Sequence, residues 1–370
     1  MTQMRIVLVI SNLIHGGAET QVIAMSRELR RRGHAVAIYT LNSNNPRACE
    51  LDGSGVELVA DQKRMKLDPA VIWRLRRFLR AFGADVVHGF LYDGDLYSRV
   101  AAAATGIPAL NSERNDNYRL KRQQQLGLWL TRHLTDGVVA NSHAGARFAA
   151  RLFRIPEARV HVVWNGVDLA AVDSRVRVCK QNYKTEFFAD ASIRLACLVG
   201  NIKPAKDYQL ALSVADLLTR NNPAWKVLFV GDRLTEAESY SRQIMSAYRD
   251  LELEGRVLFA GLRKDVPEIM SQCDVVFSTS QHEGFPNVVL EAMAVGTPVV
   301  STEYSDIRRI LPLPWQIVAE RTPEVIASTI LRAQEQHEVL APMQRAWVET
   351  HATVQLAGEY LERTYREFLS

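Results

Sequence analysis

The chain has 370 residues, 47% of them hydrophobic and 23% charged, with a net charge of +4, which is ordinary for a globular protein. One hydrophobic core rarely serves more than roughly 250–300 residues, so the length favours two domains. No apolar run reaches 18 residues, which excludes a transmembrane helix. The four cysteines match no metal or redox spacing, which excludes a cysteine-based site and indicates reduced, cytosolic cysteines.

The first part of the chain alternates short apolar runs with helical patterns. Residues 5–10 ("RIVLVI") predict a strand that is too short for a signal peptide, 11–20 a glycine-containing loop, 21–33 a helix and 35–41 the next strand. The pattern recurs from 84 and from 136. Strands alternating with helices predict a parallel sheet covered by helices on both faces.

A second series of the same kind follows a polar stretch that ends near residue 190. Its apolar runs, each predicting a strand, are 193–201, 226–232, 256–262, 273–280 and 298–302. We therefore expect two doubly wound domains facing across a cleft, with ligands beyond the carboxyl ends of the strands. The amphipathic tail from 353 to 370 either packs on its own domain or crosses back to the first.

The segment "HEGFPNVVLEAMAVG", residues 282–296, combines a polar loop with a predicted helix. Pro286 suits the first helical position, and the helix N-terminus favours a phosphate. Glu283 in the loop and Glu291 on the helix can each accept from adjacent sugar hydroxyls. For two isolated glutamates, however, a capping or solvated role is the simpler interpretation.

Two further positions suit a sugar diphosphate. Lys206 follows a strand and opens a helix, where a fixed cation stabilises the negative charge that builds up on a leaving diphosphate. Gly16 and Gly17 follow the first strand and allow close approach of a ligand, although a plain turn is the alternative. The dinucleotide pattern G-x-G-x-x-G is absent.

Several segments together resemble glycosyltransferase family 4. They are the E-x7-E signature from Glu283 to Glu291, "GGAE" at 16–19, "NGVD" at 165–168, "GNIKPAKDY" at 200–208 and the run from 261 into the signature. The resemblance covers nearly the whole chain.

This resemblance implies a GT-B fold of two Rossmann-like domains. Residues 1–170, with a crossover helix at about 353–370, would bind the acceptor, and 171–352 the nucleotide-sugar donor. Glu283 would bind the transferred sugar, Glu291 the ribose, and transfer would retain the anomeric configuration. The implied donor-binding positions are Gly16, Gly17, Asn201, Lys203, Lys206, Leu262, Arg263, Glu283, Gly284, Phe285, Pro286, Asn287 and Glu291.

The sequence departs from the family pattern at two places. Asn201 stands where many members have arginine, so either Lys203 supplies the missing charge or the phosphate is held more weakly. His88-Gly89-Phe90 keeps only the first histidine of an H-x-H pattern. His88 is a catalytic candidate that orients the donor or acceptor, and a packed histidine is an equal alternative. The acceptor candidates are Asp93, Asp95 and Arg114.

Charge is unevenly divided along the chain. Residues 1–170 hold 23 Lys+Arg and 15 Asp+Glu, a net +8, and the remainder is net −4. A basic first domain suits an anionic membrane surface, with clusters at Arg74, Arg76, Arg77 and Arg80, and at Arg114, Arg119, Lys121 and Arg122. The apolar face of the helix predicted from 69 to 83 is interpreted as core. No nucleic-acid platform is present.

The sequence thus predicts a retaining transferase that uses a nucleotide sugar. A UDP-sugar is the favoured donor, and a GDP-sugar is possible. Its acceptor would be a glycan or a lipid-linked sugar of bacterial surface polysaccharide or lipopolysaccharide. No tightly bound cofactor or metal is expected, and the location would be cytoplasmic or at the inner face of the membrane. The alternatives are a nucleotide-sugar 2-epimerase on the same fold and a catalytically silent sugar-nucleotide-binding protein.

Overall fold

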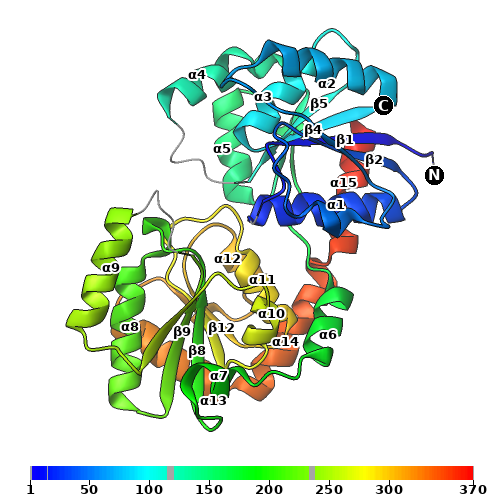
Figure 1. The fold of residues 1–370 in the computed structure, drawn as a ribbon. Coiled ribbons are helices and arrows are strands. Elements are labelled where there is room, and N and C mark those ends of the chain that lie inside the picture. Colours follow the sequence, from blue (N-terminus) through cyan, green and yellow to red (C-terminus); the bar gives the residue numbers. More distant parts are fainter. Residues whose placement is uncertain (1, 15, 115–120, 233–237, 370) are drawn as a thin grey trace. The chain divides into compact units, whose positions relative to one another are not determined.

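The computed structural model describes residues 2–14, 16–114, 121–232 and 238–369, and the chain divides into two compact units (Figure 1). The first unit contains Met1–Gly166 together with Thr353–Ser370, and the second contains Val167–Ala352. The division after Gly166 lies close to the predicted boundary at 170.

The first unit is built on a parallel sheet that, within the described residues, has seven strands in the order β3-β2-β1-β4-β5-β6-β7. The reversal of strand order beside β1 is that of a doubly wound fold. The strands are β1 (Arg5–Ile10), β2 (Ala35–Thr40), β3 (Glu57–Ala60), β4 (Val86–Phe90), β5 (Ala109–Glu113), β6 (Gly137–Ala140) and β7 (Val160–Val162).

Helices cover both faces of this sheet. They are α1 (Gly17–Arg31), α2 (Pro69–Phe82), α3 (Leu91–Ala102), α4 (Arg122–Leu130), α5 (His143–Phe153) and α15 (Val354–Glu367). The two faces of β1 show the arrangement, because alternate side chains of a strand point to opposite sides. Ile6, Leu8 and Ile10 pack with α1 and α15, whereas Val7 and Val9 pack with α2 and α3. Both faces are buried, as a parallel sheet requires.

The boundaries of α2 follow from its end residues. Asp68 accepts a hydrogen bond from the Ala70 N–H, Pro69 occupies the first helical position, and Gly83 ends the helix at φ +64°. Val71, Leu75 and Leu79 are fully buried, so this apolar face belongs to the core as predicted. Helix α1 begins at Gly17, four residues earlier than the sequence pattern predicted.

The second unit repeats the architecture with a parallel sheet in the order β10-β9-β8-β11-β12-β13. Its strands are β8 (Arg194–Val199), β9 (Trp225–Val230), β10 (Val257–Gly261), β11 (Val275–Ser278), β12 (Val299–Thr302) and β13 (Ile317–Val318). Its helices are α6 (Leu169–Val178), α7 (Tyr183–Phe188), α8 (Tyr208–Asn221), α9 (Glu238–Asp250), α10 (Val266–Met270), α11 (Asn287–Ala294), α12 (Ile307–Ile310), α13 (Pro323–Glu335) and α14 (His337–His351).

The C-terminal helix crosses back to the first unit, which resolves the two alternatives for the tail. In Figure 1, α15 lies beside α1, and the two helices pack together. Leu361 and Tyr365 are fully buried in the core of the first unit. Glu362 bonds Arg32 and Arg366, each at 2.7 Å, so an ion-pair network joins α15 to the end of α1.

We expect Glu362→Gln to lower the free energy of unfolding by about 1–3 kcal/mol at pH 7, because it removes the carboxylate shared by Arg32 and Arg366. Burial opposes the ionised form of Glu362, but the hydrogen bonds and charges of Arg366 and Arg32 prevail and lower its pKa to about 2. A lowered carboxyl pKa stabilises the fold above the unfolded value near 4.5, and this stabilisation is lost as the pH falls toward 2.

Urea unfolding across this pH window measures the effect. The difference between wild type and Glu362→Gln should shrink as the pH falls below about 4.5. The control is Glu359→Gln, an exposed position on the same helix, which we expect to change stability by no more than about 0.5 kcal/mol. A difference that stays constant with pH would contradict this account of α15.

Candidate active site

An ion pair lies in the loops that follow two adjacent strands of the second unit. Lys206 ends the short 3₁₀ helix Pro204–Lys206 after β8, and Glu283 lies in the loop after β11, which pairs with β8. Lys206 Nζ is 2.7 Å from Glu283 Oε1. Ser280 Oγ donates to the same carboxylate oxygen at 3.1 Å. Both charged side chains remain about one-fifth exposed, so a ligand can reach them.

Close packing around Gly200 positions Lys206. A Cβ atom on Gly200 would lie 2.6 Å from Lys206 Cε, so a side chain here would displace the lysine chain from its present position. Tyr208 Oη donates to the Gly200 carbonyl, and Thr279 Oγ1 donates to the Lys206 carbonyl at 2.7 Å. The backbone on both sides of the lysine is therefore tied to the carboxyl edge of the sheet.

Arg321, which sequence reasoning did not single out, ties the two loops together. Its Nη2 bonds Asp207 Oδ2 at 2.7 Å and the Thr279 carbonyl at 2.6 Å, and its Nη1 bonds the Ser280 carbonyl at 2.9 Å. Asp207 takes φ +51° and caps α8 through Leu210 N–H. The sequence pattern gave no signal for this arginine, which follows the two-residue strand Ile317–Val318 that the apolar runs did not predict.

Electrostatics favours charge on Lys206. Burial opposes its charged form, but the negative charge of Glu283, helped by Tyr304 and Glu291, prevails and raises the pKa of the lysine. Burial raises the pKa of Glu291 to about 7, against the opposing charges of Arg175 and Lys206. Glu291 is thus a carboxyl that changes its charge near neutral pH.

The signature helix begins one residue later than predicted. Helix α11 starts at Asn287, and Pro286 stands at the N-cap with no side-chain cap bond among the described residues. Ser305 Oγ donates to the Gly284 carbonyl at 2.8 Å, which holds the loop, and Phe285 is buried beneath it. The N-terminal end of α11 and Glu283 therefore belong to one loop.

The remaining predicted donor positions have mixed surroundings. Asn201 Oδ1 accepts from the Asp232 N–H at 2.9 Å, so this side chain supports a turn. Lys203 is exposed. Leu262 is exposed, and Arg263 pairs with Asp265 at 2.6 Å and Glu186 at 3.1 Å.

Gly16 and Gly17 lie where β1 meets α1. Gly16 is the N-cap of α1 and has an extended backbone, and a Cβ there would lie 2.2 Å from Glu19 Oε2. The missing side chain thus makes room for the buried carboxyl of Glu19. Gly17 is exposed at the first position of the helix.

His88 is packed in the core of the first unit. Its imidazole is fully buried, Nδ1 lies 2.7 Å from Tyr365 Oη, and the ring is tilted at 36° against that of Phe90, with the ring centroids 4.4 Å apart. Burial, together with the charge of Arg114, holds the pKa of His88 well below its ordinary value. The structure therefore favours the packing alternative for His88, and we do not retain it as a catalytic residue.

The acceptor candidates also need revision. Asp95 is buried and accepts from the Ser112 N–H at 3.0 Å, and burial raises its pKa well above the usual range. Arg114 is nearly buried and bonds Asn165 Oδ1 at 2.7 Å, and burial lowers its pKa to about 10. Asp93 is partly exposed and pairs with Lys63. Only Asp93 of the three presents its charge near the surface.

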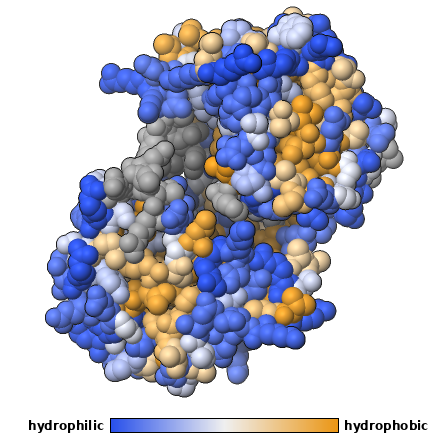
Figure 2. All heavy atoms as spheres, in the orientation of Figure 1, coloured by the Kyte–Doolittle hydropathy of each residue, from blue (hydrophilic) through white to orange (hydrophobic). Residues whose placement is uncertain are grey.

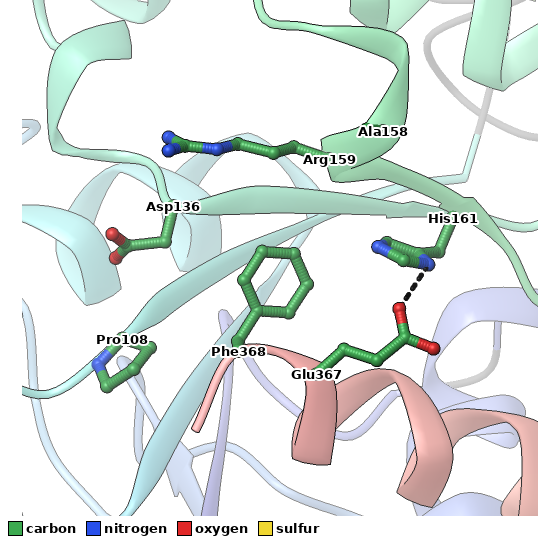
Figure 3. Close-up of a pocket in the computed structure, with 7 residues that line it drawn as sticks. All are labelled: Pro108, Asp136, Ala158, Arg159, His161, Glu367 and Phe368. Atoms are coloured by element: carbon green, nitrogen blue, oxygen red, sulfur yellow. Dashed lines mark ion pairs between the residues drawn. The ribbon is translucent and has the colours of Figure 1, made fainter. Parts of the chain in front are cut away.

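A hollow at the amino-terminal edge of the first sheet is a different feature. Figure 3 shows His161 facing Glu367, with the ring of Phe368 beside them. Nδ1 of His161 lies 3.6 Å from Glu367 Oε2. Asp136 Oδ2 accepts from the Ala109 N–H at 2.8 Å, and Phe368 lies against Gly137. His161 pairs with Glu367 at the end of α15 and Asp136 bonds the backbone of β5, so we do not assign this hollow as the active site.

The described parts of the chain contain neither a metal-binding cluster nor a membrane-spanning helix. No group of three or more His, Cys, Asp or Glu residues there could hold a metal ion. No helix there is long and apolar enough to cross a membrane.

Two family models match the chain in succession. The model described as "Glycosyltransferase Family 4" matches residues 15–171, and "Glycosyl transferases group 1" matches residues 180–347. Together they span most of both units.

Similar proteins and structures agree with these matches. The GDP-mannose-dependent alpha-mannosyltransferase of Mycobacterium tuberculosis is 25% identical over 349 residues, covering 86% of this chain and 85% of that protein. The UDP-Gal:alpha-D-GlcNAc-diphosphoundecaprenol alpha-1,3-galactosyltransferase of Escherichia coli is 24% identical over 237 residues, covering 61% of this chain and 59% of that protein. The matches to several other curated relatives span only 39% to 44% of those proteins.

A solved structure confirms the predicted GT-B fold. Anabaena HepE, crystallised with UDP and glucose, superposes with a TM-score of 0.84 at 18% identity, covering 99% of this chain and 100% of that chain.

We expect Arg321→Gln to destabilise the second unit by about 1–3 kcal/mol, because it removes the charged donor that Asp207 shares with the Thr279 and Ser280 carbonyls. Hydrogen exchange of residues 279–283 should accelerate, and the urea midpoint should fall. The control is Arg308→Gln, whose pair with Glu303 is exposed and should contribute at most about 1 kcal/mol. Unchanged exchange in Arg321→Gln would show that this arginine does not hold the loops.

Proposed function

Because the chain belongs to glycosyltransferase family 4, we propose that it transfers a sugar from a nucleoside diphosphate sugar to a glycan or glycolipid acceptor. We further propose that the transfer retains the anomeric configuration, and that the second unit binds the donor.

The Lys206–Glu283 ion pair is the observation that carries this proposal. Breaking the bond between a sugar and a diphosphate develops negative charge on the leaving phosphate, and a fixed cation stabilises that charge more in the transition state than in the ground state. Lys206 supplies such a cation, since its pKa is raised. Glu283 beside it can accept hydrogen bonds from the hydroxyls of the transferred sugar.

Glu291 is positioned to serve a second set of hydroxyls. It lies on α11, about one turn beyond the loop that contains Glu283, and its charge is felt by Lys206. We assign it to the ribose of the donor. We assign the backbone of Gly284 to Asn287, at the N-terminus of α11, to the diphosphate, because such a terminus favours anions.

The names of similar proteins guide the choice of donor base and acceptor. HepE was crystallised with UDP and glucose, while the M. tuberculosis relative is named for GDP-mannose, and we favour UDP because the superposition with HepE spans nearly the whole chain. The E. coli relative is named for a diphosphoundecaprenol-linked acceptor, which supports a lipid-linked or glycan acceptor. On the first unit we retain Asp93 as the candidate for binding the acceptor. We propose that the protein acts in the cytoplasm or at the periphery of the membrane.

We expect Lys206→Ala and Glu283→Ala each to lower kcat for sugar transfer by about 10²–10³-fold, because each removes a group fixed at the developing charge or at the sugar. The assay measures nucleotide release with a panel of UDP- and GDP-sugars and lipid-linked acceptors. Lys180→Ala, an exposed lysine of the same unit, is the control and should be fully active.

Retained activity in both site variants, with circular dichroism showing folded protein, would exclude this site. NMR of the product distinguishes retention from inversion at the anomeric carbon. An epimerised nucleotide sugar formed without acceptor would instead identify a 2-epimerase.

We expect donor affinity to fall up to about tenfold between pH 8 and pH 6. The pKa of Glu291 is raised to about 7, so below pH 7 its carboxyl is protonated, and the bound proton stabilises the unliganded second unit. This stabilisation is lost as the pH rises through 7 and the carboxyl ionises. Only the ionised carboxylate can accept from both ribose hydroxyls, so affinity rises in that window. Calorimetric titration with a nucleotide sugar checks this, and Glu291→Gln should be weaker and independent of pH. An identical pH profile in Glu291→Gln would contradict the ribose assignment.

A further inference from the structure

The first unit exposes a group of large apolar side chains on two neighbouring segments, which we call the α2–α4 patch. Exposed fractions are 59% for Met65, 57% for Leu67, 61% for Trp73, 55% for Leu126, 41% for Trp129 and 54% for Leu130. Figure 2 shows apolar surface near α4 on this unit, beside strongly hydrophilic surface. Single exposed apolar residues are ordinary, but a gathering of this kind marks an interaction site.

Helix α4 carries its apolar residues on the solvent side. Leu126, Trp129 and Leu130 follow the spacing of one helical face and are all exposed. The opposite side is already occupied, because Leu128 is buried and Gly127 lies against Tyr92. The exposed stripe is therefore not needed for the core of the unit.

The two segments of the patch are neighbours in space. Lys66 Nζ lies 3.5 Å from Gln123 Oε1, which brings the stretch before α2 to the first turn of α4. Helix α3 packs against both α2 and α4. Within residues 64–67, basic and apolar side chains alternate and all four are exposed.

The charge around the patch is predominantly positive, although Asp93 pairs with Lys63 and Asp61 pairs with Arg74 at its edge. Residues 62–82 and 121–134 contain ten Lys+Arg and one acidic residue, Asp68, which is buried as the cap of α2. Three of the arginines predicted to face a membrane are held elsewhere. Arg74 pairs with Asp61, Arg76 bonds the Ala101 carbonyl, and Arg114 is buried against Asn165. Arg77 and Arg132 lie over the rings of Trp73 and Trp129. Arg119 lies outside the described residues.

We propose that the α2–α4 patch binds the surface of an anionic phospholipid membrane. Tryptophan rings prefer the headgroup level, leucine and methionine enter the boundary of the acyl chains, and Lys and Arg pair with anionic headgroups. A protein partner of opposite charge would need acidic residues that pair with these cations, whereas a lipid surface satisfies apolar and basic groups together. The proposal goes beyond sugar transfer and does not depend on it.

Vesicle co-sedimentation tests the proposal with the full chain. The protein should bind vesicles of phosphatidylglycerol and phosphatidylcholine in equal parts, but not pure phosphatidylcholine, and binding should weaken in 0.5 M salt. Arg64→Gln with Lys66→Gln should weaken binding by about 30-fold. Leu126→Gln with Leu130→Gln should weaken it while leaving the charge unchanged.

Matched variants on the second unit provide the controls. Lys180→Gln with Arg249→Gln removes the same charge from exposed positions, and Val339→Gln removes an apolar side chain that is 58% exposed. Both should bind like wild type, and thermal unfolding should confirm that every variant is folded. Vesicles carrying a lipid quencher should quench the tryptophan fluorescence of wild type but much less that of Trp73→Phe with Trp129→Phe.

Three results would overturn the proposal. The first is no binding to anionic vesicles, and the second is an equal loss of binding in the control variants. The third is a dimer that Leu126→Gln with Leu130→Gln dissociates while vesicle binding is absent, because the patch would then join two copies of the chain.

Discussion

The ion pair between Lys206 and Glu283 is the interaction on which the account of the second unit depends. It joins two loops that follow adjacent parallel strands, so the pair forms only if β8 and β11 are correctly paired. In the absence of ligand, each charge satisfies the other and neither is buried alone, which limits the cost of keeping both in a partly buried place. A sugar diphosphate would divide the pair, offering phosphate to the lysine and hydroxyl groups to the glutamate.

Several residues without chemical roles make that pair possible. Gly200 leaves the space that the lysine chain occupies, and Thr279 fixes the carbonyl of Lys206. Arg321 links Asp207 to the backbone after β11, so the lysine loop and the glutamate loop move as one. Fixed donors and charges of this kind lower the reorganisation that a reaction would otherwise require.

The alternation of apolar runs and helical patterns predicted two parallel-sheet units, because local periodicity reports which face of each element is buried. This alternation did not reveal β3, β5 or β13, which are short strands of four, five and two residues. Contacts between residues that are distant in the sequence could not be predicted from local patterns either. The burial of His88 depends on Tyr365, 277 residues away, and the role of Arg321 on Asp207, 114 residues away. Lys206, Glu283 and Glu291 could be singled out because each belongs to a local segment of recognisable pattern.

The most direct test of the divided pair is a comparison of UDP with an intact UDP-sugar by isothermal titration calorimetry in Lys206→Ala and Glu283→Ala. Lys206 should contact the diphosphate common to both ligands, so its loss should weaken both by a similar factor. Glu283 should contact only the sugar, so Glu283→Ala should weaken the UDP-sugar and leave UDP unchanged or tighter. Equal weakening of UDP and UDP-sugar in Glu283→Ala, or unchanged binding of both in Lys206→Ala, would contradict the account.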